Sequence, residues 1–377
     1  MENSQDQITR IYGAQIMLRQ LQAMWGEVNG VLEANDIECI HRMRVASRRL
    51  RAAQAVFDQL VFRRNYRKWE RAIRGVTRAL GAARDLDIQL ETIRRFRLTV
   101  LDPRCKAGAN RLFLRLLQQR AEAQKGVIAA VNRFNRSNVV SQAQVQLEKL
   151  IPVPDLTEVD DPYLRYMAAQ GITEKLQILL SFEPFVDKPE AKAELHAMRI
   201  AAKHLRYTVE IFAPLFPQYQ KNWLKVLKDI QDALGYMHDC DVWAEFIPAF
   251  IEDEKQLTRD YFGNLRGFRS LLPGIEVFRQ NRESERQRRY LEFFGIWQQS
   301  VRKQTWRKMD AQMQKVLSLL QAELSPDQPE LQEEITEETL SPAEVNDVSE
   351  IDPESNYPEL MNQETEEDLQ DENRSDQ

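Results

Sequence analysis

The sequence contains a long internal repeat, and this repeat limits the folds that the chain can adopt. HRMRVASRRLRAAQAVF (41–57) aligns with HAMRIAAKHLRYTVEIF (196–212) at a constant offset of 155 residues. A second block, WERAIRGVTRALGAARDLDIQLE (69–91), aligns with WLKVLKDIQDALGYMHDCDVWAE (223–245) at an offset of 154 residues. Because His, Arg, Leu, Phe, Trp, Gly and two Asp recur in register, the body of the chain is predicted to be a duplicated unit.

The fold class follows from the spacing of the apolar residues, which recur every three or four positions as in amphipathic helices. No segment shows the two-residue alternation that a half-buried strand requires. The pattern predicts an all-α protein of two pseudo-symmetric helical bundles. Residues 272–291, which begin near Pro273-Gly274, have a less clear pattern. The expected helices cover residues 5–34, 41–61, 64–80, 85–98, 105–137, 162–183, 190–213, 218–234, 239–254, 256–271 and 292–323.

Composition divides the chain into four parts. The last 53 residues carry 19 Asp and Glu and one basic residue, Arg374, a net charge of −18, whereas the rest carries +12. With a single aromatic residue and five prolines, this acidic tail is predicted to be disordered. The Pro and Asp content of IPVPDLTEVDDP predicts a linker. We therefore expect a first helical repeat over 1–137, a linker over 138–161, a second helical repeat over 162–324 and the tail over 325–377.

The cysteines and the apolar runs exclude several classes of protein. Cys39, Cys105 and Cys240 are odd in number and far apart, so they predict neither a metal site nor a disulfide framework. The N-terminus lacks an apolar signal core, and no run of 18 apolar residues occurs. We expect a cytoplasmic protein with no membrane-spanning segment and no membrane partner.

The first repeated block places its cations on one side of a helix. With 100° per residue, His41, Arg44, Arg48 and Arg51 fall within an arc of about 80°. The opposite side of the wheel carries apolar residues that predict a core-facing surface. The second copy repeats this division. Its cationic stripe is His196, Arg199, Lys203 and Arg206, and the apolar positions of the two copies are Met43, Ala46, Leu50, Ala53 and Phe57, then Met198, Ala201, Leu205 and Phe212.

Such a stripe favours an anionic ligand. Like charges three or four residues apart destabilise a helix by a few tenths of a kcal/mol per pair, and the first copy has no acidic residue to offset them. Arginine gives planar, multi-donor recognition of phosphate oxygens, and lysine supplies a compact charge. A single basic stripe is usually solvated surface; two copies at the same spacing, each opened by a histidine, favour a binding site.

The second repeated block adds cations and a pair of aspartates. Arg67, Arg71 and Arg74 align with Lys221, Lys225 and Lys228, and we expect them to be contacts of second rank. Asp85, Asp87, Asp239 and Asp241 follow Gly81 and Gly235, which are expected to end a helix, so each Asp pair is interpreted as the start of the next helix. His238-Asp239 resembles the His-Asp pair of metal-dependent phosphohydrolases, but four histidines offer a metal centre few ligands. No metal, cofactor or catalytic residue is therefore expected.

These motifs together resemble the two halves of a CHAD domain, the conserved histidine α-helical domain, over roughly residues 5–320. The resemblance implies a pair of helical bundles whose basic central cavity binds inorganic polyphosphate, and an association with polyphosphate granules. His204 stands where Arg49 stands in the first copy, so its part in binding is open. The Glu-x-Glu-x-Lys strand of the triphosphate-tunnel domain that accompanies many relatives does not occur. The binding positions implied are His41, Arg44, Arg48, Arg49 and Arg51, then His196, Arg199, Lys203, Arg206 and Tyr207.

Other functions remain open at this point. Nucleic acid could bind the same basic surface, although Tyr207 is the only aromatic residue interleaved with the stripes for base stacking. A metal-dependent phosphohydrolase would need a carboxylate cluster to hold its metal ions, and a helical scaffold would leave the duplicated stripes without a role. We therefore predict a non-enzymatic polyphosphate-binding protein.

Overall fold

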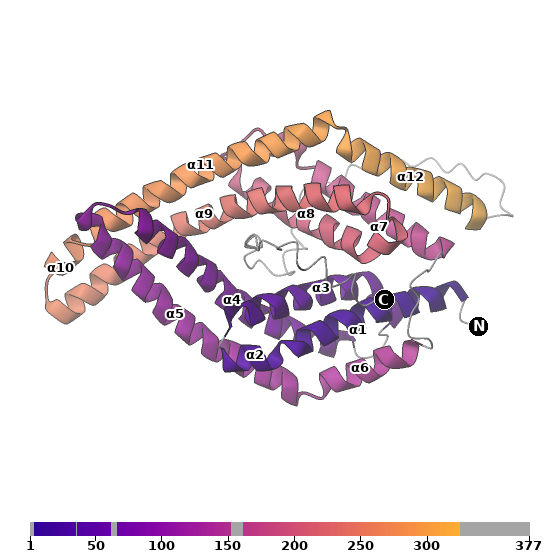
Figure 1. Ribbon diagram of the computed structural model, residues 1–377, viewed down its shortest axis with the longest axis horizontal. Coiled ribbons are helices and arrows are strands. Elements are labelled where there is room, and N and C mark those ends of the chain that lie inside the picture. The colour runs from indigo at the N-terminus through magenta and orange to yellow at the C-terminus, as the bar shows by residue number, and fades with distance from the viewer. Residues whose placement is uncertain (1–3, 35, 62–65, 152–160, 325–377) are drawn as a thin grey trace, which may run out of the picture.

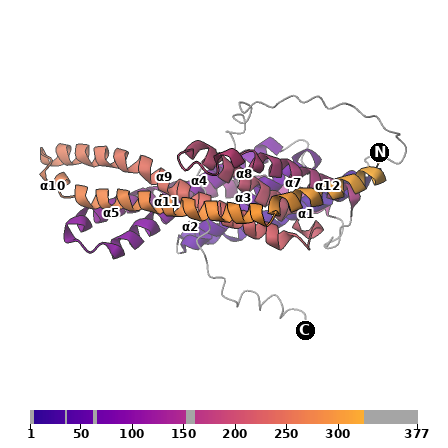
Figure 2. The ribbon, with the colours of Figure 1, turned by 90° about the horizontal axis from the view of Figure 1, so that it is seen from above.

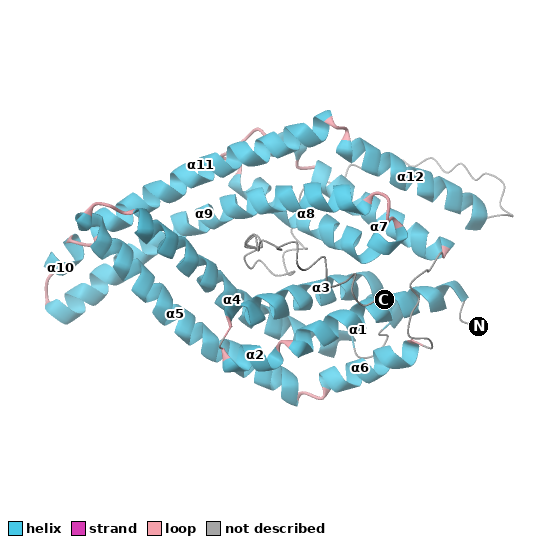
Figure 3. Ribbon diagram, viewed as in Figure 1, coloured by secondary structure: helices cyan, strands magenta, loops and turns pink. Residues whose placement is uncertain are grey.

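The structure, a computed structural model, describes residues 4–34, 36–61, 66–151 and 161–324. Every regular element in this part of the chain is a helix (Figure 3), which confirms the all-α prediction. The predicted tail, 325–377, lies outside the described residues. The α-helices are α1 (Ser4–Gly26), α2 (Val28–Glu33), α3 (Ile37–Val61), α4 (Tyr66–Thr99), α5 (Pro103–Arg136), α6 (Val139–Leu150), α7 (Pro162–Leu180), α8 (Lys192–Phe212), α9 (Gln220–Phe262), α10 (Arg266–Arg269), α11 (Leu272–Arg302) and α12 (Thr305–Leu324).

The helices form two bundles of matching design (Figure 1). In the first, α1 packs on α3 and α6, and α4 pairs with α5 as a long hairpin. In the second, α7 packs on α8 and α12, and α9 pairs with α11 in the same way. The repeated sequence blocks occupy α3 and α4 in one bundle and α8 and α9 in the other, so the duplication is visible as pseudo-symmetry.

The two repeated helices, α3 and α8, pack against each other where the bundles meet. Their apolar faces are buried as predicted, with Met43, Leu50 and Phe57 in the core. Phe57 and Phe212, the last apolar residue of each copy, have ring centroids 5.9 Å apart. Tyr12 of α1 stacks on Phe212 and donates a hydrogen bond of 2.6 Å to the Ile211 carbonyl. One core therefore runs through both bundles and fixes the relative position of the two stripes.

The outer halves of the two long hairpins form an arm with a second core of its own. Phe96 and Phe278 stack edge to face beside Trp243. Gly108 of α5 and Gly274 of α11 lie where the two helices touch, and a Cβ atom on either would collide with a backbone oxygen of the other helix. Glycine is required at both positions because only a bare backbone permits this approach.

The two glycines that were expected to end helices do not do so. α4 continues through Gly81 and α9 continues through Gly235, and both glycines are buried. Burial of the surrounding helix outweighs the low helix propensity of glycine, about 1 kcal/mol per residue. The Asp pairs therefore lie inside long helices, and the interpretation of Asp85 and Asp239 as residues at helix starts is wrong.

Two further segments differ from the sequence expectation. The proposed linker, 138–161, contains α6, whose Ala143 and Leu147 are buried against the first bundle; its Pro-rich part, 152–160, lies outside the described residues. Residues 272–291 belong to α11, where Pro273 occupies the first turn, a position that tolerates proline. Among the described helices, none combines the length and apolar composition that a bilayer crossing needs.

Candidate functional site

The cationic faces of α3 and α8 meet around Tyr207. The guanidinium carbon of Arg48, from the first copy, lies 5.6 Å from the Tyr207 ring centroid. That of Arg206, from the second copy, lies 5.5 Å from the same centroid. Both distances are within the range of cation–π attraction. Tyr207 therefore holds one arginine from each copy of the repeat.

One carboxylate also bridges the two copies. Glu210 of α8 accepts from Arg49 Nε at 3.1 Å and from Arg206 Nε at 3.2 Å. Residues 41–57 and 196–212 together contain eight Lys and Arg and this single acidic residue. The junction of the repeated helices thus carries a strong excess of positive charge, in a region whose partial burial weakens screening by salt.

The two stripes differ in burial. In α8, Arg199 is 1% exposed, and Lys203 and Arg206 are also buried. In α3, Arg44 is buried, but the remaining stripe residues are only half-buried; the Arg49 side chain is 42% exposed. The cations of the first copy are therefore more accessible to solvent, whereas those of the second are buried among the helices. The half-buried α3 residues are His41, Arg48, Arg49 and Arg51.

A cavity of about 670 Å³ lies beside this junction. Arg49, Tyr207 and Glu210 line it from α3 and α8, and Arg19 lines it from α1. Glutamine and apolar side chains of α1 form much of the remaining wall, together with apolar residues of α3, α8 and α9. Arg49, which lies beside the α3 stripe, thus borders a space that solvent can enter.

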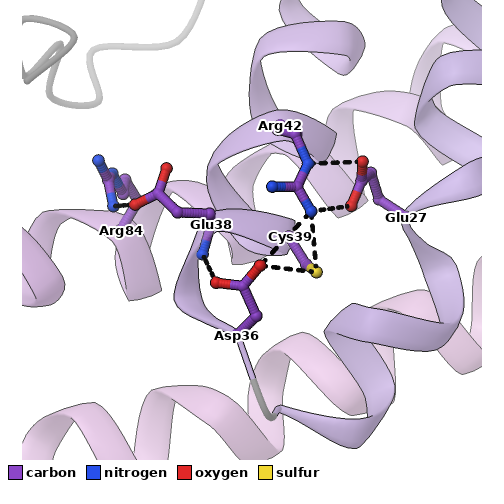
Figure 4. A network of polar contacts seen from close by, with 6 residues as sticks. All are labelled: Glu27, Asp36, Glu38, Cys39, Arg42 and Arg84. Atoms are coloured by element: carbon purple, nitrogen blue, oxygen red, sulfur yellow. Dashed lines mark hydrogen bonds and ion pairs between the residues drawn. The ribbon is translucent and has the colours of Figure 1, made fainter. Parts of the chain in front are cut away.

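The first turn of α3 is fixed by a polar network (Figure 4). Asp36 accepts a hydrogen bond of 2.9 Å from the Glu38 backbone, which stabilises the start of the helix. Arg42 donates to Glu27 at 2.7 and 3.0 Å, so this arginine is neutralised away from the stripe. Glu38 forms an ion pair of 3.5 Å with Arg84 of α4. These contacts hold the helix turn that carries His41.

The corresponding position in the second bundle is built from two histidines. His196 of α8 and His238 of α9 have their Nδ1 atoms 3.1 Å apart, so one ring donates a hydrogen bond to the other. Burial, followed by the charge of Arg199, lowers the pKa of His196 to about 4 and that of His238 to about 3. Both rings are therefore neutral at pH 7. His238 aligns with Arg84 in the repeat, and this alignment is the one sequence feature that indicates where His238 lies. The sequence does not predict its contact with His196.

His204, whose part in binding was left open, lies among cations of three helices. Burial, then Lys203, Lys175 and Arg48, lowers its pKa to about 3. The ring is therefore neutral at pH 7 and adds no positive charge to the stripe. Its neighbours nevertheless show that cations from α3, α7 and α8 converge on this point.

The Asp pairs connect the helices that surround the stripes. Asp87 accepts from Arg120 of α5 at 2.6 Å, and Asp241 accepts from Arg286 of α11 at 2.8 Å, in equivalent places of the two bundles. Burial raises the pKa of Asp239, and the charge of Arg199 opposes this rise. Asp87 and Asp241 therefore join helices of their own bundles as ion pairs, and not as helix caps.

Four of the six expected contacts of second rank lie on exposed surface, and Arg74 is half-buried. Lys221, Lys225 and Lys228 are all exposed on α9, and Lys225 pairs with Asp229 at 3.3 Å. Arg71 is exposed, and Arg74 forms an ion pair with Glu70 on its own helix. The side chain of Arg67 lies outside the described residues. Their contribution to binding stays a prediction.

Within the described residues, no group of three or more His, Cys, Asp or Glu side chains could hold a metal ion. The His196–His238 pair supplies two ligands, and the buried Arg199 beside it opposes a cation.

Comparison with known proteins places the chain among relatives of this design. The sequence model of the CHAD domain matches residues 15–248. The chain belongs to the CHAD domain family. The match contains both copies of the repeated blocks, and thus the whole α3–α8 junction.

Solved structures agree with the CHAD assignment at the level of fold. The CHAD domain from the plant Ricinus communis is 23% identical, with a TM-score of 0.51 over 71% of this chain and 91% of that one. PptA from Streptomyces chartreusis is 17% identical, with a TM-score of 0.50 over 76% of this chain and 98% of that one. At these identities the likeness establishes the shared fold. Comparison with curated proteins found no match.

Proposed function

We propose that this CHAD protein binds inorganic polyphosphate, without converting it, at the junction of α3 and α8. The observation that carries the proposal is the meeting of two like-charged stripes around Tyr207 and Glu210, with eight cations and one acid in the two repeated segments. Such a junction costs electrostatic free energy that a polyanion removes. Membership of the CHAD family supports the choice of polyphosphate as that polyanion.

Binding proceeds through the accessible first copy. Arg48, Arg49 and Arg51 of α3 offer guanidinium groups to successive phosphate oxygens, which they bind by charge-assisted hydrogen bonds. The buried Arg199 and Arg206 of α8 add attraction without needing to contact the ligand. Because each bound phosphate releases counterions, affinity falls steeply with salt and rises with chain length until both stripes are covered.

Nucleic acid is the alternative ligand of this surface. A bound RNA would need aromatic platforms for its bases, and Tyr207 is already placed between two arginines. A competition assay separates the two: labelled RNA is displaced by long-chain polyphosphate at equal phosphate concentration. We expect polyphosphate to displace RNA at a concentration where RNA does not displace polyphosphate. The reverse order of potency would overturn the choice of ligand.

The absence of catalysis has its own test. The full chain is incubated with long-chain polyphosphate and either Mg²⁺ or Mn²⁺, and released orthophosphate is measured. We expect no release above the protein-free control. Release that disappears in an Asp239→Asn variant would contradict the proposal, because it would assign the buried aspartate a catalytic part. Association with polyphosphate granules, which the proposal also implies, is tested by co-localisation with granules in cells.

A further inference from the structure

The far end of the arm exposes apolar side chains to an unusual degree. Leu101, Tyr261 and Leu98 are 89%, 84% and 81% exposed, and Phe262 is 64% exposed. These are four of the five most exposed large apolar residues in the described part of the chain. Leu98 lies in the last turn of α4, Leu101 lies in the connection to α5, and Tyr261 and Phe262 end α9. Both places lie at the same end of the molecule, at the left in Figures 1 and 2.

Local structure forces these side chains outward. Phe96 and Val100 already fill the core beside the α4–α5 turn, and Asp102 caps the following helix by accepting from the Arg104 backbone. On the other hairpin, Gly263 ends α9 in a left-handed conformation with φ of 68°. The chain then turns back to bury Phe268 in the arm core. The second core is therefore complete without the four exposed residues.

The same end of the molecule is positively charged. We define the arm end as residues 97–107 and 257–272. These segments contain six Lys and Arg against two Asp, a net charge of +4. Of the two acids, Asp102 is engaged by Arg104 at 2.8 Å. The arm end thus combines exposed leucine and aromatic side chains with surrounding cations, which are Arg97, Arg104, Lys106, Arg259, Arg266 and Arg269.

We propose that the arm end docks on the surface of a lipid bilayer that contains anionic headgroups. Leucine and aromatic side chains beside Lys and Arg are the composition of protein segments that lie in the membrane interface. The cations contact the headgroups, and Leu98, Leu101, Tyr261 and Phe262 enter the boundary between headgroups and acyl chains. This attachment requires no spanning helix, and it goes beyond the sequence expectation, which excluded a membrane partner because no apolar run is long enough to span a bilayer.

The charge of the arm end distinguishes a bilayer from other occupants. A second copy docked end to end would bring two surfaces of like charge together. Polyphosphate or nucleic acid would satisfy the cations but would give the leucines no apolar contact. An anionic bilayer satisfies both features at once.

The arm end is separate from the α3–α8 junction. The residues of the arm end pack on the second core, whereas α3 and α8 pack on the first. Bilayer docking therefore leaves the proposed polyphosphate site accessible, and the two activities can be lost independently.

The test is co-sedimentation of the full chain with vesicles of phosphatidylcholine alone and of phosphatidylcholine mixed with phosphatidylglycerol. We expect binding to the mixed vesicles only. The combined variant Leu98→Ser, Leu101→Ser, Tyr261→Ser and Phe262→Ser should reduce it about tenfold or more. The matched control is Leu291→Ser with Leu319→Ser, which removes leucines 66% and 57% exposed outside the arm end, and should bind as the unchanged chain does. Helical circular dichroism and polyphosphate binding should be retained by both.

Four outcomes would overturn the proposal. The unchanged chain could fail to bind mixed vesicles, or the four-residue variant could bind them fully. Arg48→Gln with Arg49→Gln and Arg51→Gln could abolish vesicle binding, which would assign the lipid contact to the α3–α8 cations. Light scattering could instead show a dimer that the four-residue variant converts to a monomer without any vesicle binding, which would assign the surface to a second copy.

Discussion

The two repeated helices, α3 and α8, have the same pattern of charge and differ in what surrounds it. The α8 stripe is buried to the point where Arg199 is 1% exposed, whereas Arg48, Arg49 and Arg51 of α3 are half-buried. The cations have the same spacing along the helix in both copies. Their exposure to solvent differs, because exposure depends on the neighbouring helices.

A linked pair of sequence differences accompanies this divergence. In the first bundle, Arg84 of α4 pairs with Glu38 of α3. In the second, the aligned residues are His238 and Ala193, and His238 instead meets His196 at 3.1 Å. An arginine with a carboxylate partner has been exchanged for a neutral histidine pair. The second bundle therefore has no ion pair at these aligned positions beside its buried stripe, so the copies share a charge pattern and differ in its surroundings.

The largest expected difference between the two stripes is in stability, and it is tested by removing one cation from each. Arg199→Met leaves the buried Asp239 without its compensating charge and should reduce the free energy of unfolding by about 3–5 kcal/mol. Arg48→Met, in the half-buried stripe, should reduce it by less than about 1 kcal/mol. Urea unfolding followed by circular dichroism measures both. Equal losses would contradict the assignment of a structural task to α8 and a ligand-binding task to α3.

The arm provides the opposite case, in which the two copies should behave alike. Gly108→Ala and Gly274→Ala each place a Cβ atom against the backbone of the opposite helix, and each should cost about 1–3 kcal/mol. Gly126→Ala is the control, because its Cβ would meet nothing within 4 Å and should stabilise α5 by up to about 1 kcal/mol. Thermal unfolding compares the three, and a tolerated Gly274→Ala would show that the close α5–α11 approach is not needed.

Acid should weaken the second bundle through its histidines. The pKa values of His196 and His238 in the folded protein, about 4 and about 3, lie below the ordinary value of about 6.5. The unfolded chain therefore binds protons first. The stabilisation that the neutral rings give the folded state is present above pH 6.5 and is lost as the pH falls through 4. The free energy of unfolding falls by at most about 1.4 kcal/mol per pH unit for each ring. The loss is smaller for His196, because this ring is partly exposed.

This pH dependence is measured as the thermal midpoint between pH 7.5 and pH 5. The combined variant His196→Gln and His238→Gln should show a shallower decline than the unchanged chain. Parallel declines would mean that groups other than these two histidines cause the acid sensitivity.

The smallest effect is expected from the exposed lysines of α9. Lys221→Gln, Lys225→Gln and Lys228→Gln together should change the free energy of unfolding by less than about 0.5 kcal/mol. Their loss should weaken polyphosphate binding less than threefold, because fully exposed charges are strongly screened. A larger loss, measured by filter binding, would extend the site from α8 onto α9.

The features that sequence predicted are those set by local periodicity. The helical fold, the buried faces that contain Met43 and Met198, and the phase of the cationic stripes all follow from spacing within one helix. The course of α4 through Gly81 was not predictable in this way, because tertiary burial outweighs the propensity of one glycine. Pro273 was similarly ambiguous, since proline suits both a turn and the first turn of a helix.

The unpredicted parts of the site depend on contacts between helices. The His196–His238 pair joins residues 42 positions apart, and the Arg49–Glu210 pair joins residues 161 positions apart. The sequence contains both residues in aligned blocks, but alignment shows equivalence and not proximity. The unequal burial of the two stripes has the same origin.

The most direct test of the central claim is the salt dependence of polyphosphate binding in two matched triple variants. Filter binding with long-chain polyphosphate is measured over a salt series for the unchanged chain, for Arg48→Gln with Arg49→Gln and Arg51→Gln, and for the three α9 lysine substitutions. The α3 variant should bind more than about tenfold more weakly, and its slope of log affinity against log salt should be shallower by about 2. The lysine variant should keep nearly the full slope. Equal slopes in the two variants would contradict a binding site at the junction of α3 and α8.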